Sequence, residues 1–338
     1  MRAEPDLLAR DAESLFWMAR YLERIENIAR LIDVSQSFES PGREAEAWSA
    51  LLAIHSDEAR FAEAAGLRAG ETPDPEAVKH FYLLDAGNPS SVTGCLTAAR
   101  TDARTLRSLI STEMWRQINM FHRFVERIGP GDLDGDRLSR LCVRLKESVQ
   151  AHTGITEGTM YRGQGWHFYE LGRLIERADQ TTRLLDIKYH LLVPRDREAR
   201  RVAEITQWHA VLRAAAGYHA FRRLSSAQVA VEDVVGFLLR DPSFPRSVLL
   251  CIRRIEANLE ELRRLHHLRN LADPLEAVEY LREFVLEAPT GRLLEGDLHA
   301  YLDQVQMLLM ALAGSLGRLF FRDWRPEPAQ PVAAQAQI

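Results

Sequence analysis

The chain has 338 residues, of which 46% are apolar and 27% are charged, as in an ordinary globular protein with a large core or two lobes. Acidic residues exceed basic ones, 48 against 43. This weakly negative balance argues against a strongly basic surface that binds nucleic acid or an anionic membrane.

Helical periodicity runs through almost the whole chain, and no segment alternates with the period of a strand. Near the N-terminus, apolar residues recur every three or four positions, at Leu15, Met18, Leu22, Ile25, Ala29 and Ile32. Later helices are predicted at about 44–65, 74–86, 89–128 (broken near Ser111), 132–157, 166–192, 196–223, 228–240, 245–268, 273–286 and 294–322. We therefore expect an all-α protein.

One pattern of charged residues occurs twice in the chain. "FWMARYLERIENIARLID" starts at Phe16, and "YELGRLIERADQTTRLLD" starts at Tyr169. The surroundings of Trp48 match those of Trp208, and residues 78–95 match residues 234–251. Three blocks in constant order indicate a duplicated unit, so we expect a bundle of two pseudo-symmetric halves, at about 10–128 and 166–268, with extra C-terminal helices. Residues 1–324 are predicted to form one domain, and 325–338 a disordered tail.

A charged stripe borders the apolar face of each repeated helix when residues are placed at 100° intervals. It contains Glu23, Glu26 and Arg30 in the first copy and Glu176, Asp179 and Arg183 in the second. Arg20 and Arg24 are expected on the opposite face, and their second-copy counterparts are Arg173 and Arg177. Ala19 and Gly172 lie within the stripes, where a small side chain lets another backbone approach closely.

Two interpretations of the stripes stay open. Carboxylates and guanidinium groups beside a close helix contact can form a buried ion-pair network that holds two helices in register. Alternatively, they form a site for a ligand or for catalysis. In that case the four acidic residues are the candidate catalytic groups, and the arginines are candidates for binding a substrate carboxylate.

The stretches "NPSSV" and "FPRSV" look like matched helix starts, with Asn88 as a predicted N-cap in the first. Exposed amides at such a helix start attract anions, so Ser91, Arg246 and Ser247 are further candidates for substrate binding. Plain helix capping is the alternative. The glycine-marked loop at 157–168 is either a connection between the halves or a loop that lines a site.

No pattern predicts a metal or a cofactor. The chain lacks Glu-x-x-His, His-Glu-x-x-His, Cys-x-x-Cys and a glycine-rich phosphate loop. Three unpatterned cysteines predict reduced thiols and a cytoplasmic protein. The N-terminus carries charges throughout and does not resemble a signal peptide, and no apolar stretch is long enough to cross a membrane.

The repeated blocks, with "NPSSVTGCLTAARTDAR" and "DPSFPRSVLLC" between and after them, resemble the bacterial Alpha-E family over about residues 10–322. The resemblance implies an all-helical fold and a glutamate motif that matches Glu23 and Glu26, with Glu176 and Asp179 in the second copy. It also implies two kinds of partner, ATP-grasp carboxylate–amine ligases and transglutaminase-like peptidases.

Three functions follow as hypotheses. The first is a partner or co-catalytic component of an ATP-grasp ligase that makes or modifies an amide-linked peptide. The second is a stand-alone enzyme that acts on a peptide or an amino acid through the Glu/Arg clusters. The third is a non-catalytic helical interaction module unrelated to ligation. The first rests on the resemblance and on the lack of a nucleotide loop in the sequence.

Overall fold

The structure is a computed structural model that describes residues 7–37, 44–68, 71–190, 197–224, 230–268, 271–287 and 298–321. Within these ranges every regular element is helical and there is no strand, so the all-α prediction is confirmed. The expected tail at 325–338 lies outside the described residues.

The first half of the chain contains α1 (Ala9–Ser37), α2 (Glu44–His55), α3 (Glu58–Ala65), α4 (Pro75–Leu83), α5 (Val92–Thr105), α6 (Thr112–Val125), the short 3-10 helix η1 (Pro130–Asp132) and α7 (Gly135–Thr159). The second half contains α8 (Gln164–His190), α9 (Arg197–Ala214), α10 (Tyr218–Leu224), α11 (Val231–Arg240), α12 (Val248–Leu265), α13 (Ala272–Glu287) and α15 (Leu298–Phe320).

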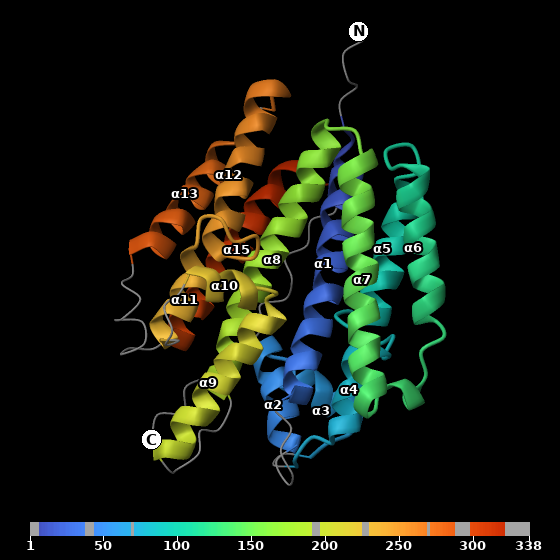
Figure 1. Cartoon of the computed structure of the whole chain (residues 1–338). Coiled ribbons are helices and arrows are strands. Elements are labelled where there is room, and N and C mark those ends of the chain that lie inside the picture. Colours follow the sequence, from blue (N-terminus) through green and yellow to red (C-terminus); the bar gives the residue numbers. More distant parts are fainter. Residues whose placement is uncertain are drawn as a thin grey trace.

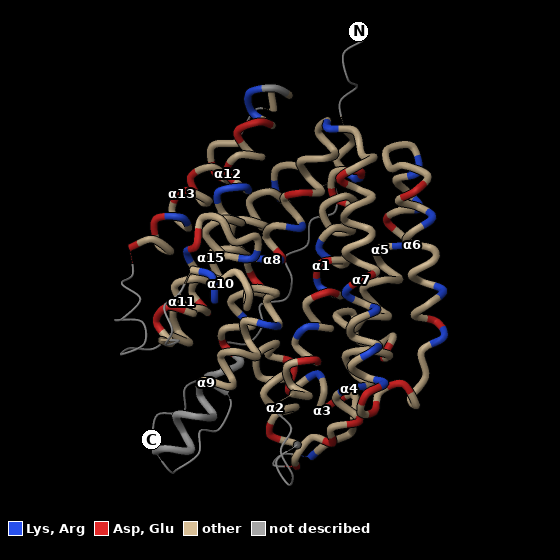
Figure 2. Tube along the Cα trace, viewed as in Figure 1, with Lys and Arg blue, Asp and Glu red and all other residues tan. Residues whose placement is uncertain are grey.

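The long helices α1 and α8 lie side by side in the middle of the bundle (Figure 1). Helices α5 and α7 pack on α1, and α12 and α15 pack on α8, so that each central helix is flanked on the side away from its neighbour. The buried apolar side chains form one continuous core that includes residues of both halves of the chain. Figure 2 shows acidic and basic positions along these two central helices as well as on the outer ones.

The backbones of the two central helices come very close at Gly172 of α8. A Cβ atom added there would lie 2.1 Å from the carbonyl oxygen of Phe16 on α1, far inside van der Waals contact. Ala19, one turn further along α1, is almost fully buried. The close approach predicted from the small residues in the two stripes is therefore confirmed for Gly172.

Corresponding positions of the repeat have corresponding local structure. Ser56 and Ala216 both have positive φ, 53° and 56°, and each ends a helix of its half. Both repeated serines cap a helix: Ser91 Oγ accepts from Gly94 N at 2.9 Å, and Ser247 Oγ accepts from Leu250 N at 3.1 Å. Superposition of the whole halves by one rotation stays a prediction.

The structure corrects several predicted helix boundaries. The helices expected at 44–65 and 196–223 are each broken in two, because Ser56 and Ala216 adopt left-handed conformations. The break expected near Ser111 is present, since Ser111 caps α6. Asn88 does not cap a helix; its Oδ1 accepts from Ser90 N in the turn that precedes α5. None of the described helices combines the length and the apolar character needed to cross a membrane.

Two glycine-to-alanine variants, one at the contact and one away from it, test the close approach of α1 and α8. Gly172→Ala should destabilise the fold by about 3 kcal/mol, because its Cβ meets backbone that cannot move aside alone. Gly154→Ala, in α7 with nothing within 4 Å, should instead stabilise by about 0.5–1 kcal/mol through helix propensity. Urea unfolding of both variants measures this, and similar stabilities for the two would contradict the close contact.

Candidate functional site

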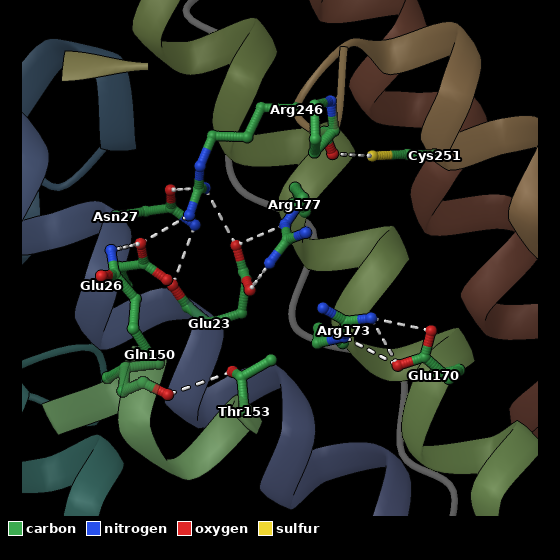
Figure 3. A network of polar contacts seen from close by, with 12 residues as sticks. Glu23, Glu26, Asn27, Gln150, Thr153, Glu170, Arg173, Arg177, Arg246 and Cys251 are labelled. Carbon is green, nitrogen blue, oxygen red and sulfur yellow. Dashed lines mark hydrogen bonds and ion pairs between the residues drawn. The ribbon is translucent and has the colours of Figure 1, made fainter. Parts of the chain in front are cut away.

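The central helices exchange glutamate–arginine partners. Arg177 on α8 donates to Glu23 on α1 through Nε at 2.9 Å and Nη2 at 2.7 Å (Figure 3). Arg24 on α1 donates to Glu176 on α8 through Nε at 2.7 Å and Nη2 at 3.1 Å. Each Glu-Arg dipeptide thus pairs with the equivalent dipeptide of the other copy, in the bidentate geometry that makes the strongest charged hydrogen bonds.

The six stripe residues are buried and paired, as their position beside the apolar face predicted. The expectation for Arg20 and Arg24 was wrong: both lie inside the bundle, where Arg20 Nε donates to Glu176 at 2.9 Å. The reason is that α8 covers the side of α1 that a surface helix would expose to water. A single-helix projection cannot show a second helix packed on the polar face.

Further along the stripes, an arginine of each central helix donates both to a carboxyl group of its own helix and to a backbone carbonyl of another helix. Arg30 donates to Glu26 and to the carbonyl of Ala214. In the second copy, Arg183 donates to Asp179 at 2.8 Å and to the carbonyl of Ile54 at 2.7 Å. Each of these arginines therefore connects its helix to the C-terminal end of a helix from the other half, α9 or α2.

Arg246 reaches into this network from the turn before α12. Its guanidinium donates to Glu23 at 3.1 Å, to Glu26 at 2.6 Å and to Asn27 Oδ1 at 3.2 Å (Figure 3). The equivalent position of the first copy is Ser90, which cannot make these bonds. The two halves therefore differ at this position of the network.

Other predicted site residues have separate structural partners. Arg173 pairs with Glu170, one turn earlier on α8, and Arg254 from α12 reaches the same carboxylate at 2.7 Å. The hydroxyl oxygens of Ser91 and Ser247 accept from helix amides and donate to the carbonyls of Asp85 and Asp241. The helix-capping alternative thus accounts for both serines.

Sequence reasoning missed several members of the network. Gln150 of α7 donates to Glu26 at 3.1 Å, and Gln180 donates to Glu176 at 3.2 Å. Glu170 could have been found from its spacing of three residues to Arg173 on one helix. Gln150 carries no comparable signal, because it comes from a helix outside both repeated stripes.

The arginines keep the central carboxyl groups ionised. Burial alone would raise the pKa of Glu176, but Arg24 and Arg20 outweigh it and lower the pKa to about 2. Arg177 and Arg246 likewise hold the pKa of Glu23 well below its usual range against the effect of burial. The pKa of Glu26 is also lowered, although burial opposes this, because Arg246 and Arg30 lie beside it. At neutral pH these groups are proton-free anions.

Little space is left around the network. A cavity of about 10 Å³ is lined by Asn27, Arg30, Leu31, Gln180, Thr181, Leu184, Ala215 and Arg246. That is roughly the room that one water molecule needs. An amino acid or a peptide does not fit beside these charges unless α1 and α8 move apart.

The glycine-marked loop at 157–168 has polar contacts of its own, separate from the central network. Arg162 stacks on Trp166, 3.4 Å from the ring centroid, and bonds to Glu157. His167 lies beside Asn258 of α12 at 2.8 Å. The first two contacts join the loop to the end of α7 and the start of α8, and the third joins α8 to α12; none of the three involves the central carboxylates. Cys95, Cys142 and Cys251 are all free and buried.

The comparison with known families fits this architecture. The family model of Alpha-E, described as a predicted alpha-helical domain with a conserved ER motif, matches residues 7–321. The chain belongs to the Alpha-E family. Its reciprocal pairs are formed by two Glu-Arg dipeptides, Glu23 with Arg24 and Glu176 with Arg177. A third such dipeptide, Glu126 with Arg127, lies on the surface at the end of α6.

Among the curated relatives of this Alpha-E chain are uncharacterized proteins of Mycobacterium bovis and Mycobacterium tuberculosis. Each is 26% identical over 267 residues, which cover 73% of this chain and 29% of the relative. The matched part of this chain therefore spans less than a third of the length of these relatives. No solved structure matches the chain.

Substitution of a buried and of an exposed glutamate, each from a Glu-Arg dipeptide, tests how much the buried network contributes to stability. Glu23→Gln should cost about 3–5 kcal/mol of unfolding free energy, because it leaves Arg177 buried without its anion and leaves Arg246 with Glu26 alone. Glu126→Gln changes an exposed glutamate of the same dipeptide type and should cost no more than about 0.5 kcal/mol. Denaturant unfolding of both variants decides the point, and equal small losses would mean that the buried pair contributes nothing.

The pH dependence of stability tests Glu176. Its pKa is about 2 in the folded protein against 4.5 for an ordinary glutamate, so the unfolded chain takes up the proton first as the pH falls. The stabilising effect is complete above about pH 4.5 and is lost towards pH 2. The stability difference between wild type and Glu176→Gln should shrink by about 3 kcal/mol across this window. A difference that does not change with pH would contradict the assignment.

Proposed function

We propose that this Alpha-E protein is a non-catalytic partner in an ATP-grasp carboxylate–amine ligase system that makes or modifies an amide-linked peptide. The observation that carries the proposal is the pairing of Glu23 and Glu176 with arginines of the opposite central helix, next to a cavity of only about 10 Å³. Amide formation requires a carboxyl group and an amine to be held together. The buried carboxylates and arginines bind one another instead, so the reacting groups would be bound by the partner.

The protonation states support the same conclusion. A general acid needs a pKa close to the working pH, so that it carries a proton to give. The arginines lower the pKa values of Glu23, Glu26 and Glu176 although burial opposes them. A general base needs a free carboxylate oxygen directed at its substrate, and both oxygens of Glu23 and of Glu176 already accept hydrogen bonds from arginines.

The mycobacterial relatives support a role in which an Alpha-E segment acts together with further protein segments. The matched segment is 29% of each of those chains, so most of each relative lies outside it. The ATP-grasp ligase and the transglutaminase-like peptidase enter the proposal from the family resemblance. The proposal places the protein in the cytoplasm, where ATP is available to the ligase.

Reconstitution with an ATP-grasp ligase encoded in the same genome tests this function. We expect the chain to co-elute with the ligase and to raise amide product and ADP release several-fold over an equal amount of unrelated helical protein. With ATP and substrates but no ligase, this chain should give no product.

Two other outcomes would replace the proposal. Product made by this chain alone would favour the stand-alone enzyme, with the Glu/Arg clusters opening to admit substrate. Equal product with and without the chain, together with no co-elution, would leave an interaction module unrelated to ligation.

A further inference from the structure

A second polar cluster lies nearer the C-terminal end of α8 than the exchanged pairs, which are in the middle of that helix. Asp186 of α8 meets His299 and Asp303 of α15. The Nδ1 atom of His299 is 2.9 and 3.1 Å from the two carboxylate oxygens of Asp186, and its Nε2 atom is 3.5 Å from Asp303 Oδ2. Asp186 is buried, while the side chains of His299 and Asp303 are 30% and 48% exposed. Solvent ions can therefore reach the cluster.

The cluster has the geometry of a metal-ligand set. One imidazole nitrogen and one oxygen from each carboxylate all lie within 4.8 Å of one another. Metal–ligand bonds of about 2.0–2.2 Å place ligand atoms up to roughly 4.4 Å apart, so small side-chain movements close the set. His299 and Asp303 are four residues apart on one helix face, and Asp186 adds the third ligand from a different helix.

The electrostatics favour a cation at this place. Asp186 lies near the C-terminal end of α8, where the helix dipole adds negative potential to the two carboxylates.

We propose that Asp186, His299 and Asp303 bind a divalent first-row transition-metal ion that joins α8 to α15. Two carboxylates and one imidazole suit ions such as Zn²⁺ or Mn²⁺ better than Ca²⁺ or Mg²⁺, which prefer oxygen ligands throughout. Three protein ligands leave coordination positions open towards solvent, where water or the oxygen of a small anionic ligand binds.

Titration of the metal-free, tag-free full chain with ZnCl2 in a calorimeter tests the site, with MgCl2 as the comparison. We expect one tight Zn²⁺ equivalent, a rise in melting temperature with Zn²⁺ and no comparable rise with Mg²⁺. His299→Ala and Asp303→Asn should each weaken Zn²⁺ binding by more than about 10-fold, because each removes a direct ligand.

His122→Ala is the matched control. His122 lies 3.3 Å from Glu126 at the same four-residue spacing, and no third ligand completes a metal set there among the described residues. It should leave Zn²⁺ affinity unchanged. Equal Zn²⁺ affinity for wild type and His299→Ala, or no Zn²⁺ effect on wild-type melting, would show that the cluster is an ion pair of protonated histidine. Asp303→Asn, at the exposed edge, gives the same decision if His299→Ala does not fold.

Discussion

The reciprocal Glu–Arg pairs between α1 and α8 are the constraint on which the rest of the structure depends. Removing a carboxylate and a guanidinium from water costs several kcal/mol per ion, and only direct, well-oriented pairing offsets that cost. Glu23 and Glu176 are almost fully buried, and each is held by two arginines. The helices therefore have one register in which every charge is paired, and a shift by one turn would leave ions unpaired.

This register has consequences for the neighbouring elements. The backbones must meet closely at Gly172, which only a residue without Cβ permits. The turn before α12 must bring Arg246 to Glu23 and Glu26, and the capping by Ser247 fixes where that turn ends. Arg30 and Arg183 then reach carbonyls of Ala214 and Ile54 across the bundle. The central charges thus contact the C-terminal ends of α9 and α2 directly.

The sequence predicted the helices, the charged stripes and their burial, because periodicity and a repeated motif report local geometry. It did not predict which arginine pairs with which carboxylate. The prediction that Arg24 lies on the face of α1 opposite the core was wrong. Its partner Glu176 is 152 residues away in the sequence, and a projection of one helix does not show contacts with another helix. The breaks at Ser56 and Ala216 were missed because neither is a glycine or a proline. The approach of Gln150 and Arg246 depends on packing between helices, which spacing along one helix does not encode.

The same pairing determines what the charged residues can do. A buried network in which each carboxylate is bonded to arginines holds the two central helices in one arrangement. The presence of two copies of one dipeptide explains why the pattern recurs in one chain: each copy completes the other.

A double-mutant cycle of Glu23→Gln and Arg177→Met tests the central claim most directly, because it isolates the coupling between the two partners from the loss of each alone. The reciprocal pairing predicts that the double variant is more stable than the sum of the single losses implies, with a coupling energy of about 1.5–3 kcal/mol. Losses that add within about 0.5 kcal/mol would contradict it.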